Sequence, residues 1–379
     1  MSHIRIESLR DAGDLQANLA TAQHFALDCE AAGFHRYTDR LCLVQVTVRD
    51  CTYVIDPLAF DPSAVLREAL EDPDVSVIMH GAGFDLRLLK RDLGIRLRGL
   101  LDTQIAAALL GEDGLGLASL LKSRLGVTLS KKYQRADWAE RPLTEGMLEY
   151  AANDTRHLRK LLEILVAELS EVGRTPWAEE EWLALEEVAD NPARPAENED
   201  PVIRVKGAGD LSPRQVTALR KALEWRDGIA RARDRAPFRV IGDQPLLEAV
   251  ARGARRVKDL TDIKGFPRGL VREEGQELLR QLQNVTEMSE EELEPFPRRP
   301  RSGPGRPPPE LEELVDRLKA VRNRKAEELG LPRGTLVSNA VILGIARAAP
   351  DDLEGLMAVE GMRRWKAEVV SKELLKVLR

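Results

Sequence analysis

The C-terminal part of this 379-residue chain repeats itself at a constant offset of 96 residues. Apolar and turn residues of the first copy recur in the second, as in the pairs Leu246 and Ile342, Gly265 and Gly361, and Leu278 and Leu374. Two copies of one small helical domain explain a fixed register of this kind. Neither copy contains a cluster of acids, so the repeats are interpreted as binding modules rather than catalytic ones.

Two breaks in composition divide the chain. Residues 178–200 hold nine acids against one arginine, a local net charge of -8, and residues 298–309 are proline-rich with four arginines and no acid. Both compositions are typical of connectors. The predicted segments are a catalytic domain over residues 1–175, an acidic linker over 176–203, a helical domain over 204–285, a Pro/Arg-rich linker over 286–308 and a second helical domain over 309–379.

The net charge of -6 hides an uneven distribution of charge. Without the acidic segment at residues 178–200 the chain carries +2, and the first repeat is rich in arginine. Local patches decide binding to a charged polymer more than the total does. A nucleic-acid partner is therefore compatible with this sequence.

Hydrophobic residues make up 43% of the chain, and no apolar run approaches the length of a membrane span. We find no signal-peptide pattern at the start and expect a cytoplasmic protein. Nothing implies a protein partner, so a monomer is expected. The three cysteines Cys29, Cys42 and Cys51 form no Cys-x-x-Cys pair, which argues against a disulfide framework and against a thiolate zinc site.

Two acids lie in a strand-like run near the start of the chain. Residues 25–30 alternate in polarity, which places Asp28 and Glu30 on one face of a strand and Cys29 on the other. Neighbouring carboxylates repel each other unless a cation lies between them, and a divalent metal is the usual solution. The alternative is a solvent-facing edge strand.

A third acid follows a buried strand. Residues 40–48 and 53–56 are typical of an antiparallel meander, whereas the apolar run at residues 75–79 suits a strand buried on both faces. A helix-like segment follows at residues 84–93, so Asp85 lies at a strand-to-helix junction and can point over the end of the sheet. A simple helix cap is the alternative role for this residue.

A tyrosine and a fourth acid lie on one predicted helix. Residues 143–172 carry apolar side chains at helical spacing and are expected to form one long helix. Tyr150 and Asp154 are off the apolar stripe and four residues apart, so they project from the same side. That side is either a functional site or a solvated face.

Cationic residues occur in two further places. A polar loop at residues 131–141 contains aromatic residues among its basic ones, an arrangement that suits phosphates and stacked bases, although a loop docked by its tryptophan is equally compatible. The first helical repeat has arginines near residues 231–235. The candidate nucleic-acid contacts are Lys131, Lys132, Tyr133, Arg135, Arg231, Arg233 and Arg235.

These four acids and one tyrosine resemble the set found in DEDD exonucleases of the tyrosine subclass. The histidine subclass would place His five residues before the last acid, where this chain has Glu149. The sequence around these residues resembles the ribonuclease D family in the segments FALDCEAAGFHRYTDRLCLVQV, IMHGAGFDLRLL, LLDTQIAA, QRADWAERPLT and YAANDTRHL. Each helical repeat is similar to an HRDC domain, a module that ribonuclease D shares with RecQ helicases.

The resemblance implies an α/β ribonuclease H-like catalytic domain followed by two all-α HRDC-like domains. It also implies two divalent ions, Mg²⁺ or Mn²⁺, bound by Asp28, Glu30, Asp85 and Asp154. Two such ions stabilise charge on the attacking and leaving oxygens of a phosphodiester, and carboxylates provide the oxygen ligands they prefer. Tyr150 would orient the attacking water, because a phenol of ordinary pKa is a poor base at neutral pH.

The resemblance implies removal of 5′-mononucleotides from RNA 3′ ends, with transfer RNA precursors as the expected substrates. A 3′-5′ exonuclease acting on single-stranded DNA is the alternative, since the same metal site can cut either polymer. A non-catalytic RNA-binding scaffold would have lost an acid, and none is missing. A helicase would need a Gly-rich phosphate-binding loop ending in Lys-Ser/Thr, which is absent from the sequence.

Overall fold

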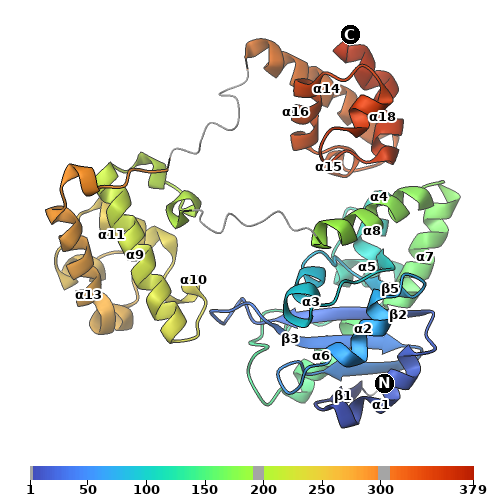
Figure 1. Cartoon of the computed structure of the whole chain (residues 1–379), viewed down its shortest axis with the longest axis horizontal. Coiled ribbons are helices and arrows are strands. Elements are labelled where there is room, and N and C mark those ends of the chain that lie inside the picture. The colour runs from blue at the N-terminus through green and yellow to red at the C-terminus, as the bar shows by residue number, and fades with distance from the viewer. Residues whose placement is uncertain (1–2, 191–199, 298–307) are drawn as a thin grey trace. The chain divides into compact units, whose positions relative to one another are not determined.

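The computed structural model describes residues 3–190, 200–297 and 308–379 (Figure 1). The chain forms two compact units. One consists of Met1–Glu30, Leu41–Pro192 and Gly305–Arg379, and the other of Ala31–Arg40 and Ala193–Pro304. The first unit therefore contains the second helical repeat and the catalytic domain except for residues 31–40, which belong with the first repeat to the other unit. None of the helices within the described ranges is long and apolar enough to cross a membrane.

A six-stranded mixed sheet forms the centre of the catalytic domain, with the order β1-β4-β3-β2-β5-β6. The strands are β1 (His3–Ile6), β2 (His24–Ala31), β3 (Leu41–Val48), β4 (Cys51–Ile55), β5 (Ser76–Met79) and β6 (Leu100–Asp102). The predicted meander is confirmed by the antiparallel pairing of β3 with β4. The pairs β2 with β5 and β5 with β6 are parallel, as expected for the later strands. β1, which the sequence did not reveal, is parallel to β4.

Helices pack around this sheet, and α3 lies where the sequence predicted a helix. The helices are η1 (Leu9–Ala12), α1 (Gly13–Leu19), α2 (Ser63–Glu71), α3 (Asp85–Leu93), α4 (Thr103–Leu109), α5 (Leu117–Leu125), α6 (Glu145–Arg156), α7 (Leu158–Glu171) and α8 (Thr175–Asp190). The apolar faces of α2, α3 and α7 are buried, as amphipathic spacing predicts.

The prediction of one long helix over residues 143–172 is wrong, because the helix breaks at His157. This residue has φ -110° and ψ 0°, which differ from the values of a regular α-helix, and it forms the turn between α6 and α7. α6 contacts β3 and β4, while α7 contacts α4, α5 and β5. The break allows two apolar faces to follow two different parts of the core.

The predicted acidic linker over residues 176–203 is also wrong in its first part. Residues Thr175–Asp190 form α8, which contacts α3, α4 and β6. Glu186 is buried and accepts a hydrogen bond from the backbone N–H of Leu100 at 2.8 Å. The composition of the segment is that of a linker, but one of its faces carries Trp182 and Ala178 into the core. Residues 191–199 lie outside the described part of the chain.

Both helical repeats have the same five main helices, and each helix of the second copy begins 96 residues after its counterpart. The first copy contains α9 (Pro213–Ala232), α10 (Pro237–Val240), α11 (Asp243–Ala251), α12 (Val257–Thr261) and α13 (Arg268–Glu287). The second contains α14 (Pro309–Glu328), α15 (Arg333–Leu336), α16 (Asn339–Ala348), α17 (Leu353–Met357) and α18 (Arg364–Leu378). Short 3-10 turns η2 (Pro201–Arg204), η3 (Ala208–Asp210) and η4 (Glu290–Glu292) flank α9 to α13.

The predicted Pro/Arg-rich linker over residues 286–308 begins later than expected. α13 continues to Glu287, and Leu293 is buried. The backbone N–H of Glu294 also donates to Thr217 of α9 at 3.0 Å, so this part of the chain packs on the first repeat. Residues 298–307, which include most of the proline-rich stretch, lie outside the described residues.

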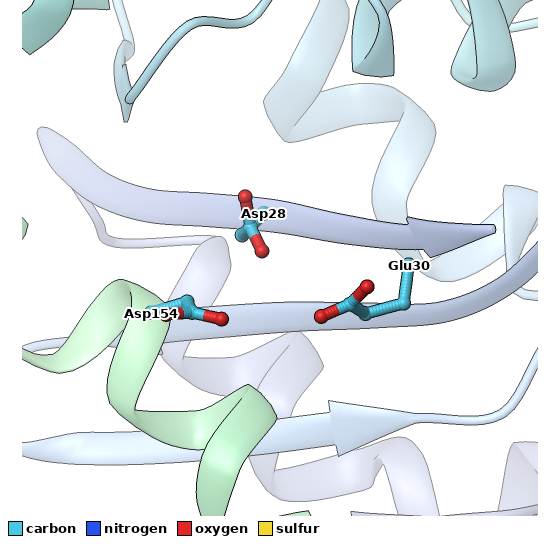
Figure 2. Close-up of side chains that lie close together, drawn as sticks. All are labelled: Asp28, Glu30 and Asp154. Carbon is cyan, nitrogen blue, oxygen red and sulfur yellow. The ribbon is translucent and has the colours of Figure 1, made fainter. Parts of the chain in front are cut away.

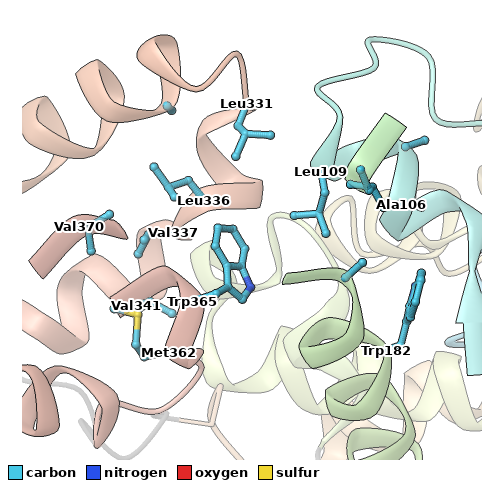
Figure 3. Packing of buried hydrophobic residues seen from close by; sticks show 14 of the residues in the cluster. Ala106, Leu109, Trp182, Leu331, Leu336, Val337, Val341, Met362, Trp365 and Val370 are labelled. Atoms are coloured by element: carbon cyan, nitrogen blue, oxygen red, sulfur yellow. The ribbon is translucent and has the colours of Figure 1, made fainter. Parts of the chain in front are cut away.

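The second helical repeat shares an apolar core with the catalytic domain. Figure 3 shows Trp365 and Leu336 of this repeat in the same buried cluster as Leu109 and Trp182 of the catalytic domain. Trp365 stacks on Trp177 of α8, with ring centroids 4.5 Å apart and an interplanar angle of 15°. Burying two large rings against each other strongly stabilises a contact of this kind.

Candidate metal and nucleic-acid site

Three carboxylates from two elements lie together. One oxygen from each of Asp28, Glu30 and Asp154 lies within 4.8 Å of the other two, and Figure 2 shows the three side chains facing one another. β2 provides the first two residues and α6 provides the third. Oxygen donors at this separation suit a hard divalent cation such as Mg²⁺ or Mn²⁺.

The position of β2 in the sheet places its two acids. β2 lies between β3 and β5, and its pairing with β5 ends at Ala26 opposite Ile78. Asp28 and Glu30 therefore follow the part of β2 that pairs with β5, while Cys29 between them is buried on the other face. Open α/β sheets bind ligands beyond the carboxyl ends of parallel strands, where these acids lie.

α6 presents the tyrosine and the fourth acid on its partly exposed side. Ala151 and Thr155 are buried against the sheet, and the hydroxyl of Thr155 lies 2.7 Å from that of Thr47 on β3. Tyr150 and Asp154 both keep partial exposure. The predicted one-turn spacing on a single helix is confirmed, because the break at residue 157 follows both residues.

Asp85 is the first residue of α3 and is 8% exposed. The predicted strand-to-helix junction is confirmed, since β5 precedes it. Besides burial, the charge of Asp28 raises the pKa of Asp85, and the charge of Asp85 in turn raises the pKa of Glu30. Asp85 thus lies close enough to interact with the other acids, although it is not one of the three whose oxygens lie within 4.8 Å of one another.

Asp102 organises the turn that leads to Asp85. Its carboxylate accepts hydrogen bonds from the backbone N–H groups of Gly81 at 3.0 Å and Ala82 at 2.8 Å, and also caps α4 through Gln104 at 2.7 Å. Asp102 is not among the predicted site residues. Its signal was an Asp between a short strand and a helix, the position of an N-cap.

Burial and mutual repulsion raise the pKa values of all four acids. Desolvation is the main cause for each, and it raises the pKa of Asp28 to about 7 and that of Asp154 to about 8. The pKa values of Glu30 and Asp85 are well above their ordinary range, with nearby carboxylates adding to the effect of burial. A cation that binds here must displace protons, so its affinity rises with pH.

Tyr150 lies among aromatic neighbours from the loop at residues 131–141. Its ring centroid is 6.0 Å from that of Trp138 and 6.3 Å from that of Tyr133. A Cβ at Gly146, one turn earlier on α6, would lie 2.7 Å from the hydroxyl of Tyr133, so glycine allows this close approach. Burial and the charge of Asp154 raise the pKa of Tyr150, which keeps its phenol protonated.

Arg141 anchors the same loop to the sheet. Its guanidinium donates to both carboxylate oxygens of Asp56 at 2.7 and 2.8 Å and to the carbonyl of Trp138 at 2.7 Å. Trp138 is 2% exposed, so both predicted features of the loop are present: it is docked by its tryptophan, and it carries exposed cations. The exposed cations are Lys131, Lys132 and Arg135, and the ammonium of Lys132 lies 5.0 Å from the ring centroid of Tyr133.

The predicted arginine contacts of the first repeat lie at the end of α9, in the other unit. Arg231 pairs with Asp227 at 3.3 Å, and Arg233 pairs with Glu273 and Glu274 at 3.2 and 3.1 Å. Arg235 is exposed. The structure therefore brings together the acids, Tyr150 and the loop at residues 131–141, but it assigns these three arginines to a separate compact unit.

The chain matches two known families of protein domains. A 3′-5′ exonuclease family matches residues 4–170, and the HRDC domain family matches residues 215–282 and 312–378. The mixed sheet, the acid cluster and the repeated helices agree with these matches. The fold is thus a ribonuclease H-like exonuclease domain followed by two HRDC domains, as the sequence predicted.

The chain belongs to the ribonuclease D family. Ribonuclease D of Pseudomonas paraeruginosa is 30% identical over 363 residues, which cover 94% of this chain and 93% of that protein. The crystal structure of Escherichia coli RNase D, described as an exoribonuclease involved in structured RNA processing, is 25% identical with a TM-score of 0.70, covering 100% of this chain and 99% of that one. The prediction of a hydrolytic 3′-5′ exoribonuclease is confirmed.

A protein from Bifidobacterium adolescentis has the same fold. It gives a TM-score of 0.81 at 24% identity, covering 100% of this chain and 97% of that one. At this identity the likeness concerns the fold alone.

Proposed function

We propose that this exoribonuclease removes 5′-mononucleotides one at a time from the 3′ ends of RNA, with transfer RNA precursors as substrates. It would use two divalent ions, Mg²⁺ or Mn²⁺, and act as a cytoplasmic monomer. The observation that carries the proposal is the convergence of Asp28, Glu30 and Asp154 within 4.8 Å, beside Tyr150. Membership of the family supports the proposed products and substrate. The acid cluster supports the proposed place of hydrolysis.

The four acids would hold the metal ions. Asp28, Glu30 and Asp154 are the central ligands, and Asp85 would contribute from the start of α3. Bound divalent ions stabilise the negative charge that develops on the attacking and leaving oxygens. The donor set fits this role because it is made only of carboxylates, and its repulsion is relieved when positive charge is present.

Tyr150 would position the attacking water. Its phenol stays protonated at neutral pH because burial and neighbouring acids raise its pKa, so the hydroxyl orients the water and does not remove a proton. Contacts with the rings of Trp138 and Tyr133 limit its rotation. A fixed hydroxyl favours the near-attack geometry that hydrolysis requires.

The loop at residues 131–141 would bind the terminal nucleotides. Lys131, Lys132 and Arg135 are exposed and can contact phosphates, while Tyr133 offers a ring for a base. Arg231, Arg233 and Arg235 would contact phosphates further from the cleaved end. A single-stranded terminus fits the site best, since the acids are largely buried and an internal phosphate of a duplex would have to be unpaired first.

Matched RNA and DNA oligonucleotides labelled at the 5′ end test this proposal. With Mg²⁺ or Mn²⁺, stepwise shortening of RNA is expected, with mononucleotides as products, and chelator should stop it. Asp28→Asn protein serves as the control for a contaminating nuclease. Faster shortening of DNA would favour a single-stranded DNA exonuclease, and internal cleavage would contradict both alternatives.

A further inference from the structure

Two phenylalanines on the second compact unit are exposed to solvent. Phe34 is 41% exposed and Phe238 is 54% exposed, and their ring centroids are 5.6 Å apart with an interplanar angle of 57°. Each ring covers only part of the other, so aromatic surface remains accessible. Apolar surface of this kind marks an interaction site when its surroundings fit a partner.

The surroundings of the two rings are cationic. The guanidinium of Arg239 lies 5.2 Å from the ring centroid of Phe34. Residues 31–40 and 227–240 together contain six arginines against three aspartates, a local net charge of +3 in a chain of net charge -6. The arginines are Arg36, Arg40, Arg231, Arg233, Arg235 and Arg239. This charge complements phosphate groups.

Hydrogen bonds hold the two segments together. The backbone N–H of Ala236 donates to the carbonyl of His35 at 3.0 Å, and the hydroxyl of Tyr37 donates to the carboxylate of Asp227 at 2.9 Å. Arg36 also lies 3.5 Å from Asp234. The two rings are therefore presented on a fixed support, which lowers the entropy lost when a ligand binds.

The HRDC fold itself does not require these side chains. At the fixed offset of 96 residues, the second copy has Gly334 at the position of Phe238 and Thr335 at the position of Arg239. Both copies nevertheless form the corresponding short helix, α10 in the first and α15 in the second. The exposed ring and the adjacent cation are thus specific to the first copy, and its packing does not explain them.

We infer that Phe34, Phe238 and Arg239 form a base-stacking platform for single-stranded RNA. Bases stack on exposed aromatic rings without regard to sequence, while neighbouring arginines contact the phosphates. A net positive charge favours RNA over an apolar protein partner, whose contact area would be depleted of charge at its centre. This inference rests on the proposed function, because it adds a second RNA contact to the same substrate.

The acids belong to one compact unit, and the platform belongs to the other. RNA long enough to reach it gains affinity, whereas a dinucleotide gains none.

The test compares RNA binding by Phe238→Leu, Phe238→Trp and parent proteins. Dissociation constants for a labelled 12-nucleotide single strand are measured in chelator, so that the RNA stays intact, at several salt concentrations. Phe238→Leu should bind roughly fivefold to a hundredfold more weakly, with an unchanged dependence on salt, because stacking releases no counterions. Phe238→Trp should bind at least as tightly as the parent. Leu9→Ala, another exposed apolar residue, serves as the matched control and should bind like the parent.

Hydrolysis rates separate this inference from the proposed function. With Mn²⁺ or Mg²⁺, Phe238→Leu should raise KM for the 12-nucleotide strand and leave dinucleotide cleavage unchanged. Equal affinity of Phe238→Leu and parent for the long strand, in protein that still trims RNA, would overturn the platform alone. An equal loss of hydrolysis rate on the dinucleotide and on the long strand would overturn the platform as well, since it would indicate a structural defect. Failure of the parent to trim RNA would instead defeat the proposed function.

Discussion

The acid cluster and the arginine-rich end of the first HRDC domain use charge in opposite ways. Asp28, Glu30 and Asp154 lie close together and are half-buried, and their pKa values rise because of desolvation and mutual repulsion. Arg231 and Arg233 are exposed and paired with surface acids. Buried like charges store free energy that a cation can release, whereas exposed pairs contribute little to stability. Catalysis and affinity should therefore be separable by mutation.

The two HRDC copies show a second contrast, because equivalent positions carry different side chains. Trp365, which stacks on Trp177, has Gly269 as its counterpart in the first copy. The counterparts of Arg231, Arg233, Arg235 and Arg239 in the second copy are Glu327, Leu329, Leu331 and Thr335. One copy is thus adapted to pack on the catalytic domain, while the other keeps a cationic surface. We propose that the first copy uses this surface to bind RNA, whereas the second copy supports the catalytic domain.

Removal of one acid should have the largest effect. Asp28→Asn is expected to lower the hydrolysis rate at least about 1000-fold, equivalent to roughly 4 kcal/mol of transition-state stabilisation. RNA affinity should change little, because the cationic surfaces remain. Single-turnover rates and dissociation constants on the same RNA measure both quantities. A variant that cleaves as fast as the parent would show that the acid cluster is not the catalytic site.

Loss of the phenol should be the next largest effect. Tyr150→Phe keeps the ring contacts with Trp138 and Tyr133 but removes the hydroxyl, and we expect kcat to fall about 100-fold to 10,000-fold. The metal concentration needed for half-maximal activity should stay the same. If that concentration rises instead, the hydroxyl supports the metal ligands and does not position the water.

The packing role of the second HRDC copy predicts a large effect on stability. Trp365→Ala should lower the free energy of unfolding by about 3 to 5 kcal/mol, because it removes a stacked, buried ring. Phe238→Ala should change stability much less, since that ring is exposed. Thermal or denaturant unfolding of both variants compares the copies directly. Similar losses in the two variants would contradict the distinction between them.

Stability in the absence of metal should fall as pH rises. The folded pKa of Asp28, about 7, exceeds its ordinary value of 3.8, so the folded state binds more protons than the unfolded state between these values. The free energy of unfolding therefore decreases from about pH 4 to pH 7. Asp28→Asn should melt a few degrees higher than the parent at pH 8 in chelator, and no higher near pH 4. A lower melting temperature of the variant at pH 8 would show that repulsion is not the dominant effect there.

A single exposed arginine should give the smallest effect. Arg235→Ala is expected to reduce the slope of log affinity against log salt by about 0.7, the value for one phosphate contact on a single strand. Arg272→Ala, also highly exposed on the same domain, is the matched control. An unchanged slope for Arg235→Ala would remove this residue from the binding surface.

Local patterns predicted the acids, because alternation on β2 and one-turn spacing on α6 fix which side chains share a face. The break at His157 could not be predicted, since residues on both sides keep helical spacing and only the separate packing of α6 and α7 explains it. The helix α8 was not predicted, because its many acids give this segment the composition of a linker and one buried tryptophan does not change that composition. The pairing of Phe34 with Phe238 depends on residues about 200 positions apart, which no local pattern reports.

We propose that the acid cluster performs the chemistry while the arginine-rich surface provides affinity. The most direct test measures the single-turnover rate at saturating RNA and the dissociation constant for two variants, Asp28→Asn and the triple replacement of Arg231, Arg233 and Arg235 by alanine. Asp28→Asn should lose the rate and keep the affinity, whereas the triple variant should keep the rate and bind more weakly. Loss of the saturated rate in the triple variant, or a normal rate in Asp28→Asn, would contradict the account.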